Sequence, residues 1–301
     1  VRATRLRTEP EDGGSAPARR VSAVETSQGL ICARHVILAA GGQSYPLLGS
    51  DGSGFELARA AGLKVVQPVP ALAGLITEDN WPKSLAGIVL ENGGIRLDIK
   101  GVAKRLLVGP VLFTHKGLSG PPALDLSGEI SALLASDLCL PSSGLRPPTI
   151  PIRLSFIASR SVADWLALFE GWRGRHGGRA LHNLLAGELP RAVATVLCGL
   201  AGAQDVAVAR AKKSVLEALA VACGDQLLHI TGTDGWDHAM VTRGGVALNE
   251  LDPHTLACRS IRGLFCAGEM VNLDGRCGGF NLTWAFASGR LAGSATHSTP
   301  V

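Results

Sequence analysis

The sequence lacks any apolar run long enough to cross a membrane. A transmembrane helix needs about 20 consecutive apolar residues, and no uninterrupted run approaches that length. Residues 1–7 mix charged and small side chains and show no apolar core of a secretory signal peptide. We therefore expect a cytoplasmic protein that has no membrane partner.

Disulfide and metal-binding patterns are also missing. The seven cysteines are odd in number and include no Cys-x-x-Cys pair, and the eight histidines show no His-Glu-x-x-His spacing. These features favour reduced thiols over a disulfide framework and argue against a zinc site. We expect no bound metal.

Most of the chain carries no excess of charge of one sign. The net charge is +4, from 29 basic and 25 acidic residues, and five of the arginines lie within the first twenty positions. The remainder is close to neutral, so the charge predicts no strong nucleic-acid surface. An RNA or other anionic substrate stays open, although solvated arginines on an edge hairpin explain the charge more simply.

Aromatic residues make up only 4% of the sequence, whereas 38 glycines and 16 prolines are present. Glycine is used where the backbone adopts a positive φ or approaches a ligand closely. We therefore expect a turn-rich α/β fold with α+β insertions, in which loops carry much of the function. A chain of 301 residues is long enough for two or three domains.

Hydrophobic patterns predict the order of the elements. Strands are expected at residues 1–7, 21–26 and 30–40, and a helix at residues 53–61 is expected to end at Gly62. Residues 64–126 resemble an all-β module, residues 161–222 predict three or four helices, residues 229–233 and 240–248 predict strands, and residues 260–293 predict a strand, a loop and a helix.

The strand at residues 36–40 is continuously apolar, which predicts burial on both faces of a sheet. If this strand and the terminal one share a sheet, the middle of the chain is an insertion. The expected segments are residues 1–63, 64–160, 161–226, 227–256 and 257–301.

The most informative stretch is a short apolar strand followed by an acid and a helix that glycines open. Residues 264–267 lead into Gly268 and Glu269, and Gly278 and Gly279 precede a helical run. This order places a carboxylate and free backbone N–H groups at the carboxyl edge of a sheet, where α/β proteins bind nucleotide cofactors. A reduced flavin carries negative charge that a helix start stabilises. The stretch predicts a flavin site, with a simple turn as the alternative.

Two glycine pairs give weaker signals. Gly52 and Gly54 precede a helix, but no strand adjoins them and Leu57 occupies the place of the third glycine, so the chain contains no dinucleotide fingerprint. Gly41 and Gly42 follow an apolar strand and fit a tight turn or a cofactor contact equally well.

A loop at residues 114–121 combines a histidine, a lysine and two glycines. It lacks the Gly-x-Ser-x-Gly elbow of hydrolases, and no strand-turn-helix pattern surrounds it. The loop fits an approach to a planar ligand and a structural turn about equally.

Five motifs together resemble a known family. Residues 36–46, 113–121, 231–236, 241–246 and 263–293 resemble the successive motifs of the HI0933-like (BaiN-type) NAD(P)/FAD-dependent oxidoreductases. The motifs stand in the family order over nearly the whole chain. The N-terminal dinucleotide-binding unit of the family has no counterpart here, and the chain begins with Val1. We therefore expect an N-terminally truncated member.

The resemblance implies a split FAD-binding domain of the glutathione-reductase type at residues 1–63 and 257–301. A β-barrel-like domain at residues 64–160 and 227–256 and a helical domain at residues 161–226 would interrupt it. The implied cofactor-binding residues are Gly41, Gly42, Gly268, Glu269, Asp274, Gly278, Gly279, Phe280 and Asn281. The loop with Thr114, Gly117, Ser119 and Gly120 would reach the cofactor from the substrate side.

By similarity, Gly41 and Gly42 approach the nucleotide portion of FAD, Glu269 lies at the ribityl chain, and residues 278–281 lie at the pyrimidine edge of the flavin. Many members have Pro-Thr before the glycine pair, where this chain has Arg276 and Cys277. The roles of these two side chains stay open.

These inferences lead to an FAD-dependent oxidoreductase that transfers hydride between NAD(P)H and a small organic substrate. Cys277 or His115 is the hypothetical proton donor, and the alternative for Cys277 is a small packing residue. Two other functions stay open: a flavin-dependent reductase of a base in structured RNA, of the dihydrouridine type, and a fragment that is inactive alone because it lacks the pyrophosphate-binding unit.

Overall fold

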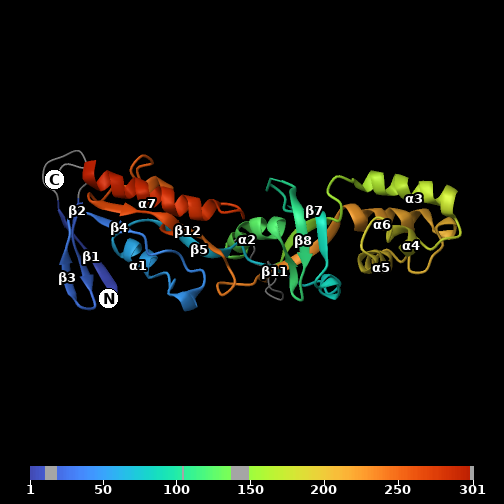
Figure 1. The fold of residues 1–301 in the computed structure, drawn as a ribbon, viewed down its shortest axis with the longest axis horizontal. Helices are drawn as coiled ribbons and strands as arrows, with labels where there is room; N and C mark the ends of the chain where they lie inside the picture. Colours follow the sequence, from blue (N-terminus) through green and yellow to red (C-terminus); the bar gives the residue numbers. More distant parts are fainter. Residues whose placement is uncertain (11–18, 104, 137–148, 299–301) are drawn as a thin grey trace. The chain divides into compact units, whose positions relative to one another are not determined.

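The computed structural model describes residues 1–10, 19–103, 105–136 and 149–298, and it divides the chain into two compact units (Figure 1). The first unit combines Val1–Leu72 with Gly235–Val301, and the second is Ala73–Asp234. The boundaries between the two units thus lie after residues 72 and 234. The predicted boundaries of the FAD-binding segments lie after residues 63 and 256. The barrel strands and the helices that follow them belong to one unit.

The first unit begins with a three-stranded antiparallel sheet. Its strands are β1 (Ala3–Pro10), β2 (Arg19–Thr26) and β3 (Gly29–Cys32), in the order β1-β2-β3. Leu6, Val21 and Ala23 are buried, while their neighbours along the strands are half-buried or exposed. This alternation gives the sheet one core-facing side, as expected for a half-buried sheet.

Two further strand pairs complete the sheets of this unit. β4 (Val36–Leu38) pairs in parallel with β13 (Leu264–Cys266), and β5 (Val65–Ala71) pairs antiparallel with β12 (Val241–Val246). The predicted continuous strand at residues 30–40 is therefore wrong, because β3 and β4 belong to different sheets. The chain turns between them, and Val36 N donates a hydrogen bond of 2.8 Å to Gly263 O.

The prediction that the strand at residues 36–40 is buried on both faces is also wrong for the described chain. Leu38 is buried, but Ile37 is 37% exposed. Among the residues that the structure describes, β4 has one strand neighbour, β13, whereas all three residues of β13 are buried. An apolar strand is buried on both faces only where other elements cover both of them, and local sequence does not report that cover.

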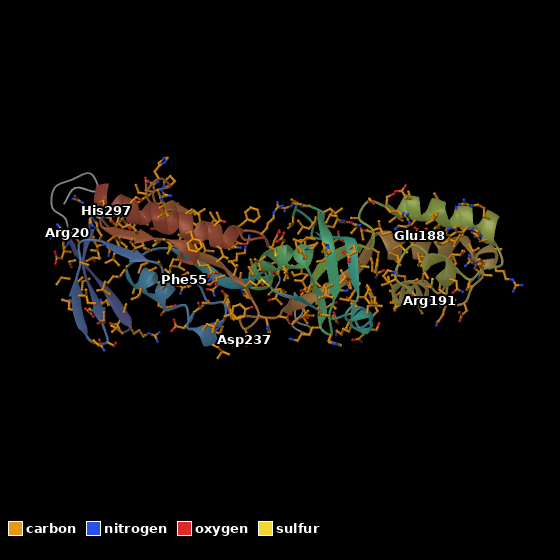
Figure 2. The ribbon with its side chains drawn as sticks, viewed as in Figure 1. Arg20, Phe55, Glu188, Arg191, Asp237 and His297 are labelled. Atoms are coloured by element: carbon orange, nitrogen blue, oxygen red, sulfur yellow. The ribbon has the colours of Figure 1, made fainter. Side chains whose placement is uncertain are left out.

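Two helices pack in the first unit, α1 (Ser53–Ala60) and α7 (Phe280–Ser298). The helix α1 ends before Gly62, whose φ of 91° confirms the predicted glycine stop. Phe55 of α1, labelled in Figure 2, is 1% exposed and belongs to a core with residues of β4, β12 and β13. Short 3-10 turns are η1 (Pro46–Leu48), η5 (Leu248–Glu250) and η6 (Gly268–Met270).

The second unit contains a closed six-stranded barrel in the order β10-β11-β6-β9-β8-β7. These strands are β6 (Leu75–Thr77), β7 (Val89–Leu97), β8 (Leu107–Phe113), β9 (Gly117–Ser119), β10 (Ile150–Ser155) and β11 (Gln226–Thr233), and η2 is Pro82–Leu85. In β10, Ile150, Ile152 and Leu154 are buried and alternate with half-buried residues. Closure leaves the barrel without a free sheet edge.

Helices account for the rest of the second unit. They are α2 (Pro121–Leu134), α3 (Val162–His176), α4 (Leu181–Leu185), α5 (Arg191–Leu200) and α6 (Lys213–Gly224), with η4 at Val208–Arg210. The four helices from α3 to α6 confirm the predicted helical segment, because Trp165, Phe169 and Trp172 lie on one buried face of α3. The all-β prediction for residues 64–126 is wrong at its end, since α2 begins at Pro121.

The described residues also bear on the cysteines, on membrane-spanning helices and on metal sites. Cys139 lies outside the described residues; the other six cysteines form no disulfide. In the described part of the chain, no helix is both long and apolar enough to cross a membrane. No group of three or more His, Cys, Asp or Glu side chains there is placed to hold a metal ion.

The fold predicts that Gly245 of β12 tolerates no side chain. Its φ is 114°, and an added Cβ would lie 2.7 Å from Met270 O in η6. We expect Gly245→Ala to lower the free energy of unfolding by about 2–3 kcal/mol because strain and a backbone clash add. Urea denaturation followed by circular dichroism measures the change.

The matched control is Gly293→Ala in α7, where an added Cβ meets no heavy atom within 4 Å. Alanine raises helix stability by up to about 1 kcal/mol over glycine. Equal stability changes in the two variants would contradict the proposed clash.

Candidate functional site

The carboxyl ends of β4 and β13 lie together because the two strands run in parallel. The chain continues from β4 into Gly41 and Gly42 and from β13 into Gly268 and Glu269. A hydrogen bond from Ala267 N to Leu38 O, 3.0 Å long, holds the two strand ends side by side. The structure therefore brings the two predicted glycine-containing turns to one edge of a sheet.

A cavity of about 590 Å³ lies at this edge, within the first unit. Its lining includes the predicted site residues Gly41, Gly268, Glu269, Cys277, Gly278, Gly279 and Asn281. Its apolar walls come from Leu72, Met240, Val241, Leu273, Leu282, Trp284 and Phe286. Apolar walls with a few polar groups are typical of a site for an organic ligand.

Glu269 is the carboxylate of this cavity. Its Oε1 accepts a hydrogen bond of 2.6 Å from Thr242 N, and its carboxylate also accepts one from the backbone N–H of Gly42. Thr242 Oγ1 in turn accepts a bond of 2.7 Å from Gln43 N. Glu269 thereby joins the turn after β4 to β12 and to the turn after β13.

Burial raises the pKa of Glu269, and the hydrogen bonds from the backbone N–H groups of Thr242 and Gly42 oppose that rise. A side chain that is buried but still accepts two backbone hydrogen bonds is ready to accept a further one from a ligand hydroxyl. The carboxylate is thus both a structural bridge and an available acceptor.

Gly42 fits this place only because it lacks a side chain. An added Cβ would lie 2.0 Å from Thr242 Oγ1 and 3.0 Å from Glu269 Oε2. Gly42 therefore lies behind the carboxylate and is absent from the cavity lining, whereas Gly41, with a φ of 80°, lines it.

The loop before α7 is shaped by glycines and held by Asn281. Gly278 and Gly279 have φ values of 122° and 89°, and the space beside Gly279 is open. Asn281 Oδ1 accepts from Gly275 N at 2.7 Å, and its Nδ2 donates to Gly275 O at 2.9 Å. The Asn281 side chain thus closes the loop on itself, and the first backbone N–H groups of α7 are left without intrahelical partners.

The helix α7 is attached directly to the end of β13. Trp284 Nε1 donates to Gly268 O at 3.0 Å, and Gly268 N donates to Ser288 Oγ at 2.8 Å. Gly268 has a φ of 64°, in the left-handed region that favours glycine. The start of α7 and Glu269 are therefore held on the same cavity.

Besides Gly42, two predicted cofactor residues lie outside the cavity lining, Asp274 and Phe280. Asp274 Oδ2 forms an ion pair with Arg243 Nη1 at 3.2 Å. Phe280 is 62% exposed. Their proposed contacts to a cofactor stay predictions, while the local role of Asp274 in tying the loop to β12 is visible.

The predicted substrate-side loop belongs to the second unit. Thr114 Oγ1 accepts hydrogen bonds from Lys116 N and Gly117 N, at 3.3 and 3.0 Å, and His115 is exposed. Ser119 pairs with Leu112 of β8. This loop is a connection between barrel strands.

The two glycines of that loop have structural reasons of their own. A Cβ on Gly117 would lie 2.4 Å from Leu75 O, and one on Gly120 would lie 2.3 Å from Pro110 O. Both glycines are required by barrel packing. A contact between this loop and a cofactor stays a prediction.

Sequence reasoning missed four residues that build the site. Thr242, Gln43, Trp284 and Ser288 position Glu269 and Gly268 through the bonds above. Thr242 stands in one of the family-like motifs, and Trp284 and Ser288 stand four apart in the helical run. That helical spacing was the available signal that both side chains face the same neighbour.

The environment of Glu269 predicts an unusual titration. We expect its pKa to lie above the ordinary glutamate value of about 4.3 because burial disfavours the charge. Since the folded pKa is raised, the contribution of this group to stability is greatest below the unfolded-state value and declines as the pH rises through the folded one. Carboxyl-carbon NMR, with Glu269→Gln to assign the signal, measures it. A pKa at or below the ordinary value would contradict the burial argument.

Comparison with known proteins shows the family to which the chain belongs. The model described as the HI0933-like protein Rossmann domain matches residues 10–295. The 3-dehydro-bile acid delta(4,6)-reductase of Clostridium scindens is 32% identical over 275 residues, which cover 89% of this chain and 63% of the relative. The match and the six-stranded barrel confirm the predicted α/β class.

Two further relatives carry another name. The ribosomal RNA dihydrouridine synthase of Escherichia coli is 31% identical over 262 residues, covering 84% of this chain and 58% of the relative. The protein of the same name from Haemophilus influenzae is 24% identical over 257 residues, covering 85% and 58%.

The chain thus spans about three fifths of the length of these curated relatives. The matched region nevertheless includes the second unit, most of the first unit and every residue that lines the cavity. The resemblance read from the five motifs is confirmed: the chain belongs to the HI0933-like family, of which its 3-dehydro-bile acid reductase relative is a BaiN-type member.

Proposed function

We propose that the protein is an FAD-dependent oxidoreductase that transfers hydride from NAD(P)H to an organic substrate. The observation that carries the proposal is the convergence of Glu269, two glycine turns and the start of α7 on one cavity at the carboxyl edge of a parallel strand pair. Ligands of open α/β sheets bind at this edge. The two segments of the first unit would form a split FAD-binding domain of the glutathione-reductase type.

The residues present fit a flavin. The cavity walls are largely apolar, as a planar aromatic ring requires, and the space beside Gly279 is open to a close ligand. Glu269 would accept a hydrogen bond from a ribityl hydroxyl, and the free N–H groups at the start of α7 would face the pyrimidine edge. When bound, FAD supplies the hydride-transfer chemistry.

The remaining cavity residues suggest what the protein itself does in the reaction. Cys277 lines the cavity and is half-buried. In a reduction of a carbon–carbon double bond, hydride adds to one carbon and a proton to the other, so two electrons pass from NAD(P)H to the substrate. Cys277 Sγ would deliver that proton. His115, which belongs to the second unit and is absent from the cavity lining, stays the other hypothetical donor.

Apolar side chains give the cavity a preference for an apolar small molecule. Met240 is 53% exposed and Phe286 78% exposed, and both line the cavity together with the buried Leu72. Such a surface suits a fused-ring or aliphatic substrate, in keeping with the bile acid named for one relative. A small unsaturated organic acceptor is therefore the first candidate substrate.

A base in structured RNA is the second candidate acceptor. Two of the relatives are named ribosomal RNA dihydrouridine synthases. The reduction of uridine to dihydrouridine also adds one hydride and one proton across a carbon–carbon double bond, so the same cofactor and proton donor would serve.

The cofactor assignment predicts that Glu269→Ala weakens flavin binding. A hydrogen bond to a charged group contributes about 1.5–3 kcal/mol, so we expect the Kd for FAD to rise about tenfold or more. The flavin content and absorbance of the purified holoprotein measure it. Glu56→Ala, which removes a side chain that is 73% exposed in α1, is the control. Equal flavin content in wild type and Glu269→Ala would argue against the assigned contact.

The proton-donor assignment is tested with Cys277→Ser and His115→Ala holoenzymes. We expect the true donor variant to retain FAD and its reduction by NAD(P)H, while reoxidation by substrate slows about 10²–10⁴-fold. Stopped-flow absorbance separates the two half-reactions. Wild-type reoxidation in both variants would exclude both residues as the donor.

A further inference from the structure

Two chain segments meet at one end of the helical part of the second unit. The helices α3 and α6 are antiparallel, since a Cβ added at Gly224, the last residue of α6, would lie 3.0 Å from Val162 N, at the start of α3. At the other end, Arg173 Nη2 donates to Ala211 O at 2.6 Å. The C-terminal end of α3 and the N-terminal end of α6 therefore lie together (Figure 1).

Backbone hydrogen bonds hold the chain segments at this end in contact. Ala209 N donates to Gly177 O at 3.1 Å, and Val208 N donates to Arg179 O at 2.9 Å. The exposed basic residues of the two segments are Arg175, His176, Arg179, Arg210, Lys212 and Lys213. We call this set the basic end.

Acidic side chains neutralise only part of the basic end. Residues 173–179 and 208–213 contain no aspartate or glutamate. The carboxylate of Glu217 lies 3.9 Å from Lys213 Nζ. Within the described ranges, the side chains of Arg179, Arg210 and Lys212 make no ion pair or hydrogen bond.

The stability of the helices explains only part of this charge. Arg175 and His176 lie in the last turn of α3, where the helix dipole favours cations. Lys212 and Lys213 lie at the start of α6, where the dipole disfavours them, and the first turn has neither an acidic residue nor a side-chain cap. The fold thus gives no reason for Lys212 at this position, whereas an anionic partner does.

The surroundings indicate the kind of anion. None of the large exposed apolar side chains in the described structure lies in either segment. A protein partner needs an apolar interface core, while a nucleic-acid backbone is bound through arginine and lysine contacts to phosphate. We propose that the basic end binds the phosphate backbone of RNA. The choice of RNA over DNA rests on the RNA-base acceptor named as the second candidate function.

The first test measures binding of a fluorescein-labelled RNA hairpin to the full chain by anisotropy, at about 50 and 200 mM salt. The variant Arg179→Ala/Arg210→Ala/Lys212→Ala removes three charges that have no ion-pair partner among the described residues. We expect about tenfold weaker binding at the lower salt and a salt slope smaller by about two, because each phosphate contact contributes about 0.7–0.9. The control is Arg191→Ala, an exposed arginine at the start of α5 (Figure 2), which should bind as wild type does.

A second variant separates binding from folding. Lys212 has a backbone conformation suited to a capping side chain, with φ −63° and ψ 150°. Lys212→Asp should therefore raise the melting temperature while weakening RNA binding, a combination that misfolding cannot produce. Flavin absorbance, recorded for each variant, should match that of wild type, so a failure of the flavin assignment is seen separately.

Three results would overturn the inference. The first is wild-type affinity and salt slope in the triple variant, and the second is an equal loss in Arg191→Ala. The third is tighter binding of a DNA duplex or an acidic peptide than of the RNA hairpin, which would assign the basic end to a different partner.

Discussion

The candidate site depends on one buried carboxylate, that of Glu269. Thr242 N donates to this carboxylate at 2.6 Å, and the backbone N–H of Gly42 donates to it as well. Gln43 N, 199 residues from Thr242 in sequence, donates to Thr242 Oγ1 at 2.7 Å. A buried carboxylate is costly without donors, so the backbone groups that satisfy it cannot move apart independently. The turn after β4, the strand β12 and the turn after β13 are thus positioned by a common need. The cavity exists only when both segments of the first unit are folded together.

Glycine makes this convergence possible at the close contacts. Gly42 leaves room for Thr242 and the carboxylate, and Gly245 leaves room for Met270 O. Because side chains are excluded from these points, the site is built largely from backbone groups and from a few side chains that hold them. Such a site supplies shape, orientation and fixed dipoles, which is what an enzyme contributes when a cofactor carries out the chemistry.

Local sequence patterns predicted those helices and strands that are determined by residues close to one another in sequence. The helix α1 with its stop at Gly62, the helices of the 161–222 segment and the strand β13 were of this kind. The exposure of Ile37 could not be predicted, because burial of an apolar strand depends on elements from elsewhere in the chain. The helix α2 was missed because residues 64–126 were expected to be all-β, although proline, here Pro121, is favoured in a first helical turn. The part played by Thr242 was hidden for the same reason as Ile37: its partners are distant in sequence.

Net charge also conceals what the fold assembles. A total of +4 in 301 residues predicts no polyanion surface. The basic end arises because residues 173–179 and 208–213, about thirty positions apart, become neighbours through backbone hydrogen bonds between Gly177 and Ala209 and between Arg179 and Val208. A phosphate backbone responds to charges within about a Debye length of some 10 Å, and it is insensitive to the average over the chain. The electrostatic character of this protein is therefore a property of its folded surface, and it differs from place to place even where the sequence as a whole is nearly neutral.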